Sequence, residues 1–325
     1  MNSFQVRTDL AVEARESVES TGEQMRGVRV EEYAYEKEAV AVTKVFIETK
    51  NAANQLGKPM GIYVTMEAEN LGEPDEGYHA EIAGCLSKEL TGLIDTLGLG
   101  EESAILVVGL GNRDVTADAL GPRVLDNLYV TRHLVRLYGK AAVGDGVNLI
   151  SCIEPGVMAK TGMETAEIIN GVVKETKPDA ILVIDALAAR SVRRLNRTIQ
   201  ITNTGIQPGS GVGNHRNALT EESLNVPVIA IGVPTVVDAA TIVNDALESL
   251  MESEKAYWRN SFTDLNNMYV TGKDVDEIIK RVSFTISEGI NAALKTGEHG
   301  EKSALKTGER GGGEKRHRKK SGSIR

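Results

Sequence analysis

Apolar and polar positions alternate along the first part of the chain with the two-residue period of a β-strand. The segments VRVEEYAY, AVAVTKVFIETK and GIYVTMEA, between residues 28 and 68, follow this period. Such alternation is typical of strands with one solvated face, as in an antiparallel sheet. Residues 77–98 place their apolar side chains at helical spacing instead, so we expect a helix there.

Beyond residue 100 the pattern changes to continuous apolar runs that are followed by helical segments. We expect strands at residues 105–109, 147–157, 180–184, 198–202 and 226–237, and helices after residue 121 and over 161–176, 238–251 and 275–294. Strand, loop and helix in alternation indicate a parallel sheet. The predicted fold is therefore α/β: a mostly parallel sheet flanked by helices, with an additional antiparallel portion near the N-terminus.

The composition is that of one large globular domain. Of the 325 residues, 41% are hydrophobic and only 4% aromatic, so the core must consist mainly of aliphatic side chains. No apolar stretch approaches the ~18 residues of a membrane span, and no secretory signal is visible, so we expect a cytoplasmic protein without a membrane partner. Cys85 and Cys152 are expected to be buried, reduced thiols.

The net charge of −9 is distributed unevenly. Residues 295–325 hold ten Lys and Arg against four Glu, a charge of +6, which leaves −15 for the rest of the chain. This tail repeats ALKTGEHGEK as ALKTGERGGGEK and is almost free of apolar residues, so we expect it to be disordered. A nucleic-acid arm would explain its charge. A solubilising extension is the favoured interpretation.

Two aspartates follow the buried runs of the predicted parallel sheet. Asp185 directly follows the run AILVI, and Asp118 lies in the loop after the run AILVVG. Ligand sites of open α/β sheets lie at the carboxyl ends of strands, so two carboxylates would converge on one crevice if these strands are neighbours. Such a pair can hydrolyse an amide by acid and base catalysis. Each aspartate could instead bond backbone amides, as a helix cap or at a strand end.

Other candidate residues lie near these aspartates. GLGN, residues 109–112, resembles a dinucleotide loop but lacks its third glycine, so no cofactor is expected. His215 could join Asp118 and Asp185 as a metal ligand, although a lone histidine is more often structural. Arginines can hold an acidic substrate residue through paired hydrogen bonds; the candidates are Arg190, Arg193, Arg194 and Arg216. No G-x-S-x-G, H-E-x-x-H or P-loop pattern occurs.

Seven collinear blocks match the pattern of one family. They are QVRTDLAVEA (5–14), VVGLGNRDVTADALGP (107–122), VTRHL (130–134), EPGVMAKTGMETAEII (154–169), IDALAAR (184–190), NTGIQPGSGVGNHR (203–216) and IGVPTVVDAATI (231–242). Together they resemble the germination protease family of spore-forming bacteria, over roughly residues 5–294.

This resemblance implies a sequence-specific endopeptidase that starts the degradation of small acid-soluble proteins on spore DNA during germination. It implies a catalytic pair, Asp118 in TADALGP and Asp185 in IDALAAR, on a fold similar to that of the hydrogenase maturation proteases, without a cofactor or resident metal. It also implies a zymogen of the spore core that assembles as a homotetramer and processes itself.

The family cuts its substrates between an acidic and a hydrophobic residue, as in TE–IASE, and residues 8–13 read TDLAVE. We therefore expect autocleavage between Asp9 and Leu10. The chain would then consist of a propeptide (1–9), a protease domain (10–294) and a basic tail (295–325). Two alternatives stay open: a metal-dependent protease that uses Asp118, Asp185 and His215, and a non-catalytic binding protein on the same fold.

Overall fold

The structure, a computed structural model, describes residues 8–19, 26–100, 102–139, 143–144, 146–209, 217–239, 241–243, 268–294 and 296. Its strands are β1 (Val28–Tyr35), β2 (Val40–Ile47), β3 (Gly61–Ala68), β4 (Ala104–Gly109), β5 (Leu149–Ile153), β6 (Ala180–Ala189), β7 (Thr198–Thr202), β8 (Val228–Asp238) and β9 (Tyr269–Val270). Its helices are α1 (Ala11–Glu19), α2 (Lys50–Leu56), α3 (Glu76–Thr96), α4 (Leu120–Leu125), α5 (Arg132–Tyr138), α6 (Met158–Thr161), α7 (Thr165–Thr176), α8 (Glu221–Leu224) and α11 (Val275–Ala293), with short 3-10 turns η1 (Thr116–Asp118) and η3 (Val192–Arg194).

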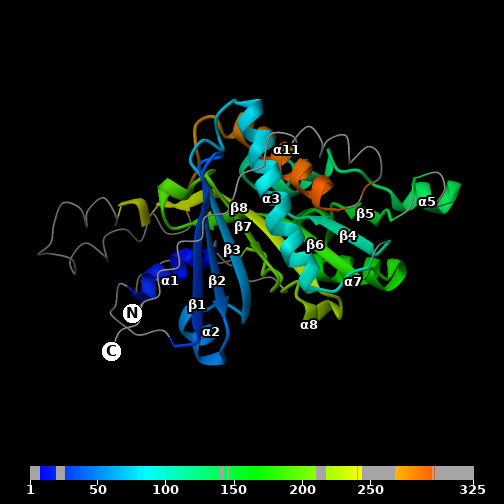
Figure 1. Ribbon diagram of the computed structural model, residues 1–325, viewed down its shortest axis with the longest axis horizontal. Helices are drawn as coiled ribbons and strands as arrows, with labels where there is room; N and C mark the ends of the chain where they lie inside the picture. The colour runs from blue at the N-terminus through cyan, green and yellow to red at the C-terminus, as the bar shows by residue number, and fades with distance from the viewer. Residues whose placement is uncertain are drawn as a thin grey trace, which may run out of the picture.

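One mixed sheet joins all of these strands. Its order is β1-β2-β3-β7-β8-β6-β4-β5, and β9 pairs with β8 (Figure 1). The pairs of β4 with β5, β4 with β6 and β6 with β8 are parallel, whereas the pairs from β1 to β3, β3 with β7, and β8 with β7 and β9 are antiparallel. The α/β class is confirmed, but the sheet is mixed rather than mostly parallel. The antiparallel strands near the N-terminus continue the same sheet.

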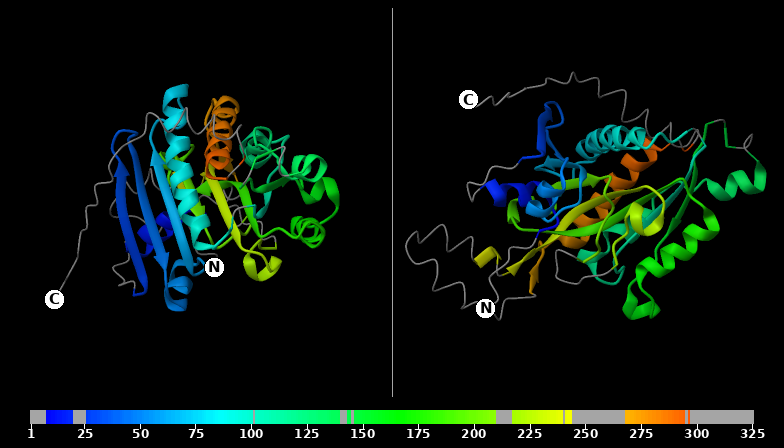
Figure 2. Two further views of the ribbon diagram at one scale, coloured as in Figure 1. Left: turned by 45° about the vertical axis from the view of Figure 1, so that its right-hand side comes forward. Right: turned by 90° about the horizontal axis from the view of Figure 1, so that it is seen from below.

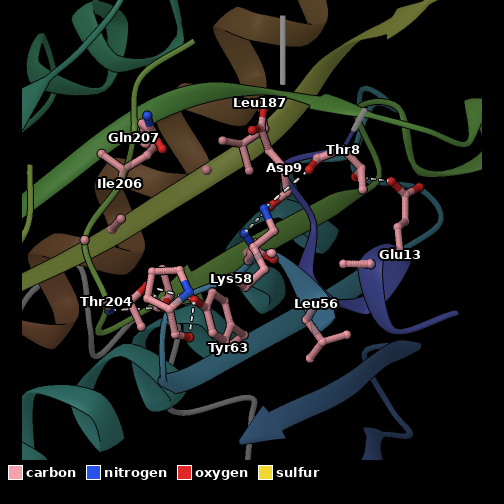
Figure 3. Close-up of a pocket in the computed structure, with 18 of the residues that line it drawn as sticks. Thr8, Asp9, Glu13, Leu56, Lys58, Tyr63, Leu187, Thr204, Ile206 and Gln207 are labelled. Carbon is pink, nitrogen blue, oxygen red and sulfur yellow. Dashed lines mark hydrogen bonds between the residues drawn. The ribbon is translucent and has the colours of Figure 1, made fainter. Parts of the chain in front are cut away.

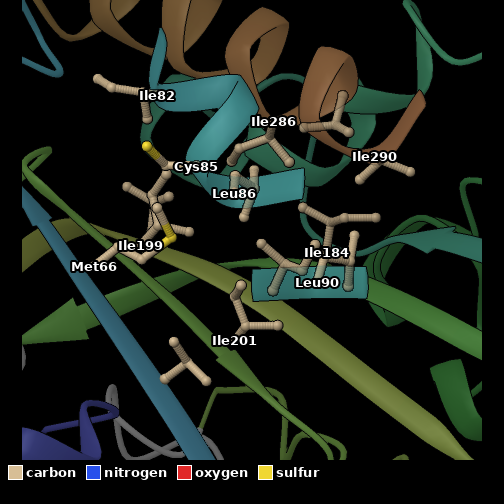
Figure 4. Packing of buried hydrophobic residues seen from close by; sticks show 14 of the residues in the cluster. Met66, Ile82, Cys85, Leu86, Leu90, Ile184, Ile199, Ile201, Ile286 and Ile290 are labelled. Carbon is tan, nitrogen blue, oxygen red and sulfur yellow. The ribbon is translucent and has the colours of Figure 1, made fainter. Parts of the chain in front are cut away.

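One face of the sheet is covered by the two long helices α3 and α11, which lie side by side across it (Figures 1 and 2). Their apolar stripes meet side chains of β3, β6, β7 and β8 in the largest core cluster (Figure 4). A Cβ on Gly289 of α11 would lie 2.7 Å from Cδ2 of Leu86 on α3, so this glycine allows the two helices to approach closely. The helices therefore fix one face of the central strands as solid core.

The opposite face is covered in two separate places. Helices α7 and α8 pack on the parallel half of the sheet, where Ile169 and Leu224 contribute to a second apolar cluster. Helices α1 and α2 pack on the antiparallel half, against β2 and β3. The central strands between these two covers present polar side chains of the same face, and there the candidate site lies.

The predicted elements largely match those observed, with three informative differences. Strand β6 does not end at residue 184 but continues to Ala189. The helix predicted over 161–176 begins only at Thr165, because Gly162 adopts a left-handed conformation (φ 71°) and ends the short preceding helix α6. Strand β8 extends to Asp238, where a helix was expected to begin, and residues 240 and 244–251 of that expected helix lie outside the described residues.

Two further findings concern the whole chain. Cys85 is buried in the core beneath α3, whereas Cys152 on β5 is only half-buried, and both are free thiols. Within the described ranges, no helix is both long and apolar enough to cross a membrane.

Candidate active site

A pocket of about 740 Å³ opens on the sheet face that α3 and α11 leave uncovered. Its floor is a row across three strands: Asp185 of β6 lies opposite Gly232 of β8, which lies opposite Gln200 of β7. Neighbouring strands are about 4.8 Å apart, so the Cα atoms of Asp185 and Gln200 are separated by roughly 10 Å. The side chain of Leu187 covers the glycine between them, since a Cβ on Gly232 would lie 2.5 Å from Cγ of Leu187.

Asp185 reaches this floor because β6 is longer than its neighbour β4. Strand β4 ends at Gly109, which pairs with Ile184, so Asp185 is the first residue of β6 beyond that end. The side chain is buried, and its Oδ1 accepts a hydrogen bond from the amide of Ala186, 2.9 Å away. The strand alternation that directs Ile184 to the α3 and α11 core directs Asp185 to the pocket.

Asp118 lies in η1, within the loop that joins β4 to α4. Its carbonyl oxygen and its Oδ2 both accept hydrogen bonds from the amide of Asn112, at 3.0 and 2.9 Å. Gly111 makes this turn possible: it has φ 114°, and a Cβ there would lie 1.9 Å from the Asp118 carbonyl oxygen. The side chain of Asp118 therefore holds its own loop closed.

The loop that carries Asp118 packs against the strands that form the pocket floor. Leu110 donates its amide to the carbonyl of Ile184 at 2.8 Å, and Thr235 of β8 donates its hydroxyl to the carbonyl of Ala117 at 2.6 Å. The two predicted aspartates are thus carried by contacting elements. Among the described residues, the pocket is lined by Asp185 and not by Asp118.

The N-terminal segment Thr8–Ala11 crosses the pocket and is bound by its main chain (Figure 3). The amide of Asp9 donates to the carbonyl of Ala188 at 3.0 Å, and Oδ2 of Asp9 accepts from the amide of Ala188 at 2.9 Å. Oε1 of Gln200 accepts from the amide of Ala11 at 2.7 Å. The expected Asp9–Leu10 cleavage site is therefore docked on β6 at Ala188, three residues beyond Asp185, and Asp9 and Asp185 line the same pocket.

Two side chains donate to the carbonyl oxygen of Asp9. Nζ of Lys58 lies 2.9 Å from it and also 3.3 Å from the carbonyl oxygen of Thr8, and Nε2 of Gln200 lies 3.2 Å away. In Figure 3, Lys58 extends from the far wall of the pocket toward Asp9. Burial lowers the pKa of Lys58, and the carboxylates of Asp9 and Glu13 offset part of that effect.

The position of Lys58 follows from the helix before it. Thr49 caps the start of α2 by accepting the amide of Ala52, and Gly57 ends the helix in the left-handed conformation with φ 61°. The chain then turns, and the amide of Lys58 bonds to the carbonyl of Ala53 at 3.1 Å. The buried hydroxyl of Tyr63 donates to the carbonyl of Pro59 at 2.9 Å, which fixes the residue that follows Lys58.

Leu10 and Glu13 anchor the segment after the expected cleavage site. Leu10 is fully buried in a cluster with Leu187, Ala189, Val12 and Val237. Oε2 of Glu13 accepts from the amide of Arg190 at 2.7 Å, and its Oε1 accepts from the amide of Ser191 at 3.0 Å. Thr8 donates its hydroxyl to Glu13, so the six residues TDLAVE fold onto one another as well as onto β6.

The predicted arginines lie where β6 ends, but they contact the segment in different ways. Arg190 binds Glu13 through its backbone amide, and the exposed Arg193 bonds through its amide to the hydroxyl of Ser191. Arg194 makes two hydrogen bonds with Glu16, at 2.7 and 2.8 Å, and a longer contact of 3.4 Å with Glu13. The carboxylate of Asp9 accepts a hydrogen bond from the Ala188 amide.

Two predicted site residues, His215 and Arg216, lie outside the described residues. The structure therefore does not describe how Asp118, Asp185 and His215 would be arranged as metal ligands. Within the described part of the chain, no group of three His, Cys, Asp or Glu residues is arranged to hold a metal ion.

The sequence patterns did not single out Lys58 and Gln200. A signal for Gln200 exists, since it is a long polar side chain at the centre of the buried strand TIQIT. Such a residue needs hydrogen-bond partners, and a pocket can supply them. Lys58 gave no signal, because a lysine after a helix-ending glycine is ordinary on a protein surface.

Comparison with known proteins places these features in a family. The family model described as germination protease matches residues 6–263. The germination protease of Caldanaerobacter subterraneus subsp. tengcongensis is 44% identical over 315 residues, which cover 90% of this chain and 95% of that protein. That of Clostridium perfringens is 43% identical over 316 residues, covering 90% and 96%. That of Bacillus mycoides is 45% identical over 253 residues, covering 78% and 68%.

Proposed function

Because this chain belongs to the germination protease family and is thus a peptidase of spore germination, we propose that it is a sequence-specific endopeptidase that cuts itself between Asp9 and Leu10. Its substrates are the small acid-soluble proteins of the spore core, cut between an acidic and a hydrophobic residue. The active form is a homotetramer, and the fold is related to the hydrogenase maturation proteases. Residues 1–9 are the propeptide, residues 10–294 the protease domain, and residues 295–325 a basic tail.

One observation carries this proposal: Asp9, at the expected cleavage site, lines the same pocket as Asp185. A segment that is to be cut must lie beside the hydrolytic group. Here the chain holds that segment with hydrogen bonds on both sides of the Asp9–Leu10 bond, to Ala188 and Gln200. The docked segment also occupies the place that a substrate would take, which supports a zymogen.

The proposed chemistry is hydrolysis by Asp118 and Asp185 acting as a pair. Carboxylates that approach closely do not ionise independently, and the proposal requires Asp118 and Asp185 to share one proton in this way. The ionised member removes a proton from water, which attacks the Asp9 carbonyl carbon, and the protonated member supplies the proton that the reaction requires. The pair titrates as a unit, so either aspartate can take either part.

The test uses the full chain and mass spectrometry of its N-terminus over time, with and without a chelator. We expect the wild type to give a product that begins at Leu10, and to cut a small acid-soluble spore protein between Glu and Ile or Phe. We expect Asp118→Asn and Asp185→Asn to abolish both reactions without lowering Tm. The matched control is Asp114→Asn in the same loop, whose exposed carboxylate pairs with Lys160.

The outcomes separate the alternatives. Full activity of either asparagine variant would remove that aspartate from the reaction. Loss of cleavage with chelator would favour the metal-dependent mechanism with His215. A wild-type product that begins at a residue other than Leu10 would contradict the proposed processing site.

A further inference from the structure

The carbonyl oxygen of Asp9 is bound in an unusual way for a main-chain acceptor. Its partners are an ammonium group and a side-chain amide, Nζ of Lys58 at 2.9 Å and Nε2 of Gln200 at 3.2 Å. These side chains come from opposite walls, one from the end of α2 and one from β7. The bond between Asp9 and Leu10, which begins at this carbonyl, is the one whose cleavage is proposed above.

We propose that Lys58 and Gln200 form the oxyanion-binding site for cleavage of the Asp9–Leu10 peptide bond. The inference rests on the proposed self-cleavage at that bond and adds two catalytic residues to the two aspartates. In this assignment Lys58 and Gln200 bind the carbonyl oxygen, and the two carboxylates transfer protons.

The reaction balances as a hydrolysis. A water oxygen bonds to the carbonyl carbon of Asp9, one water proton passes to a carboxylate, and the electron pair of the C=O double bond moves onto the oxygen held by Lys58 and Gln200. When that pair returns, the C–N bond breaks and the nitrogen of Leu10 takes a proton from the carboxyl pair. The products are a carboxylic acid at Asp9 and an amine at Leu10, and transfer of the acid proton to the amine leaves a carboxylate and an ammonium group.

The two contacts strengthen as the reaction proceeds. A carbonyl oxygen carries only a partial negative charge, whereas the tetrahedral intermediate carries a full one, so an ammonium 2.9 Å away is attracted more strongly to the intermediate. The contact is made in a partly enclosed pocket, where water screens it less than at the surface. Burial also lowers the pKa of Lys58, which agrees with a partly enclosed site.

Gln200 is held in the orientation that this role requires. Its Oε1 accepts the amide of Ala11 at 2.7 Å, which leaves Nε2 directed at the carbonyl of Asp9. The same side chain therefore bonds to the backbone on both sides of the Leu10 residue. Across Gly232, in the same row of the sheet, lies Asp185. Gln200 and Asp185 thus lie on one face of the sheet with Leu187 over the glycine between them, and Lys58 reaches the Asp9 carbonyl from the loop after α2.

The competing explanation is that Lys58 and Gln200 only anchor the segment. The test therefore measures two things in the full chain: the first-order rate of Asp9–Leu10 cleavage by mass spectrometry, and amide hydrogen exchange of residues 10–13 in an Asp185→Asn background, where no cleavage is expected. The variants are Lys58→Met and Gln200→Glu; the glutamate keeps an acceptor for Ala11 but loses the donor. Lys50→Met, on an exposed lysine at the start of the preceding helix α2, is the control.

We expect each variant to slow cleavage by about 10²- to 10³-fold, as for removal of one oxyanion donor, with exchange protection retained and Lys50→Met unchanged. Cleavage at the wild-type rate in Lys58→Met and Gln200→Glu would overturn the assignment. Slow cleavage with lost protection in both variants would also overturn it, in favour of anchoring. If the wild type itself is not cut at this bond, the self-cleavage proposal fails first and this assignment falls with it.

Discussion

Glu89 of α3 is a buried carboxylate that lies on the core side of the sheet, away from the pocket. Its Oε2 is 2.7 Å from Nζ of Lys44 on β2, and its Oε1 accepts the hydroxyl of Tyr35 on β1. Burial alone raises the pKa of Glu89, but the bonds to Lys44 and the tyrosine outweigh it, so the pKa lies below the usual value. The ionised form of Glu89 therefore joins α3 to the edge of the antiparallel half.

A group whose pKa is lowered by folding stabilises the folded state above its unfolded pKa and loses that contribution as the pH falls through the folded pKa. We therefore expect Glu89→Gln to lower the free energy of unfolding by about 1–3 kcal/mol at pH 7, because Lys44 loses its charged partner. The difference from wild type should begin to shrink as the pH falls below the ordinary glutamate pKa of about 4.3, where the unfolded chain takes up the proton, and should be lost once the pH has fallen through the lower pKa of folded Glu89. Urea unfolding at several pH values measures this; a constant difference down to pH 3 would contradict it.

At the scale of elements, the loop from β4 to α4 depends on one glycine. Gly111 has φ 114°, and the Asp118 carbonyl oxygen occupies the place of a Cβ. The same loop is bonded to β6 and β8 through Leu110 and Ala117. A change in the backbone position of Gly111 would therefore move η1 and the Asp118 that it carries.

We expect Gly111→Ala to destabilise the chain by at least ~1 kcal/mol and to reduce cleavage far more than the change in stability explains. Gly98→Ala is the control, since Gly98 also has a positive φ of 63° but has open space where a Cβ would be built. Thermal unfolding and the rate of self-cleavage measure the two effects. Equal loss of stability and equal cleavage rates in the two variants would show that the close approach of Gly111 to Asp118 does not affect cleavage.

The sequence predicted strands better than it predicted their directions. Alternation located β1 and β3 correctly because each has one side chain in two directed at a cluster of apolar neighbours. Strand β6 was expected to end before Asp185, because an aspartate inside a buried strand is costly. It is tolerated because it faces the pocket, where the Ala186 amide bonds to it.

The mixed character of the sheet also has a local cause. Residues 190–197 join β6 to β7, and they are fewer than the dozen or more that a parallel crossover needs. Strand β7 therefore runs antiparallel to β6 and to β8, a direction that the short connection between β6 and β7 indicates. The contact of Lys58 with Asp9 had no such signal, because it depends on how α2 and the N-terminal segment pack on the finished sheet.

At the scale of the whole molecule, the described fold is complete before the basic tail. Helix α11 ends at Ala293, Leu294 is buried, and the buried hydroxyl of Thr296 lies 3.5 Å from the carbonyl oxygen of Asn291. Residues 297–325 lie outside the described residues. The part of the fold that the structure describes, and the residues that line the pocket there, come before position 297.

We expect a chain that ends at Thr296 to keep its Tm within about 2 °C and to cleave itself at the wild-type rate. We also expect the dependence of its DNA affinity on salt to equal that of the full chain, as for a solubilising extension. Binding measured at several salt concentrations tests this, with a matched chain ending in a neutral Gly-Ser tail as control. A shallower salt slope after truncation would instead identify the tail as a nucleic-acid arm.

The contact between Lys58 and Asp9 has a consequence for the moments after the cut. Hydrolysis would turn a neutral carbonyl beside the ammonium into a carboxylate, so the fragment would be held more tightly as a product than as part of the intact chain. Leu10 and the helix behind it would stay in place, because they are packed into the apolar cluster on β6. Dissociation of the nine-residue fragment, rather than cleavage of the Asp9–Leu10 bond, would then limit how soon the pocket can bind a protein substrate.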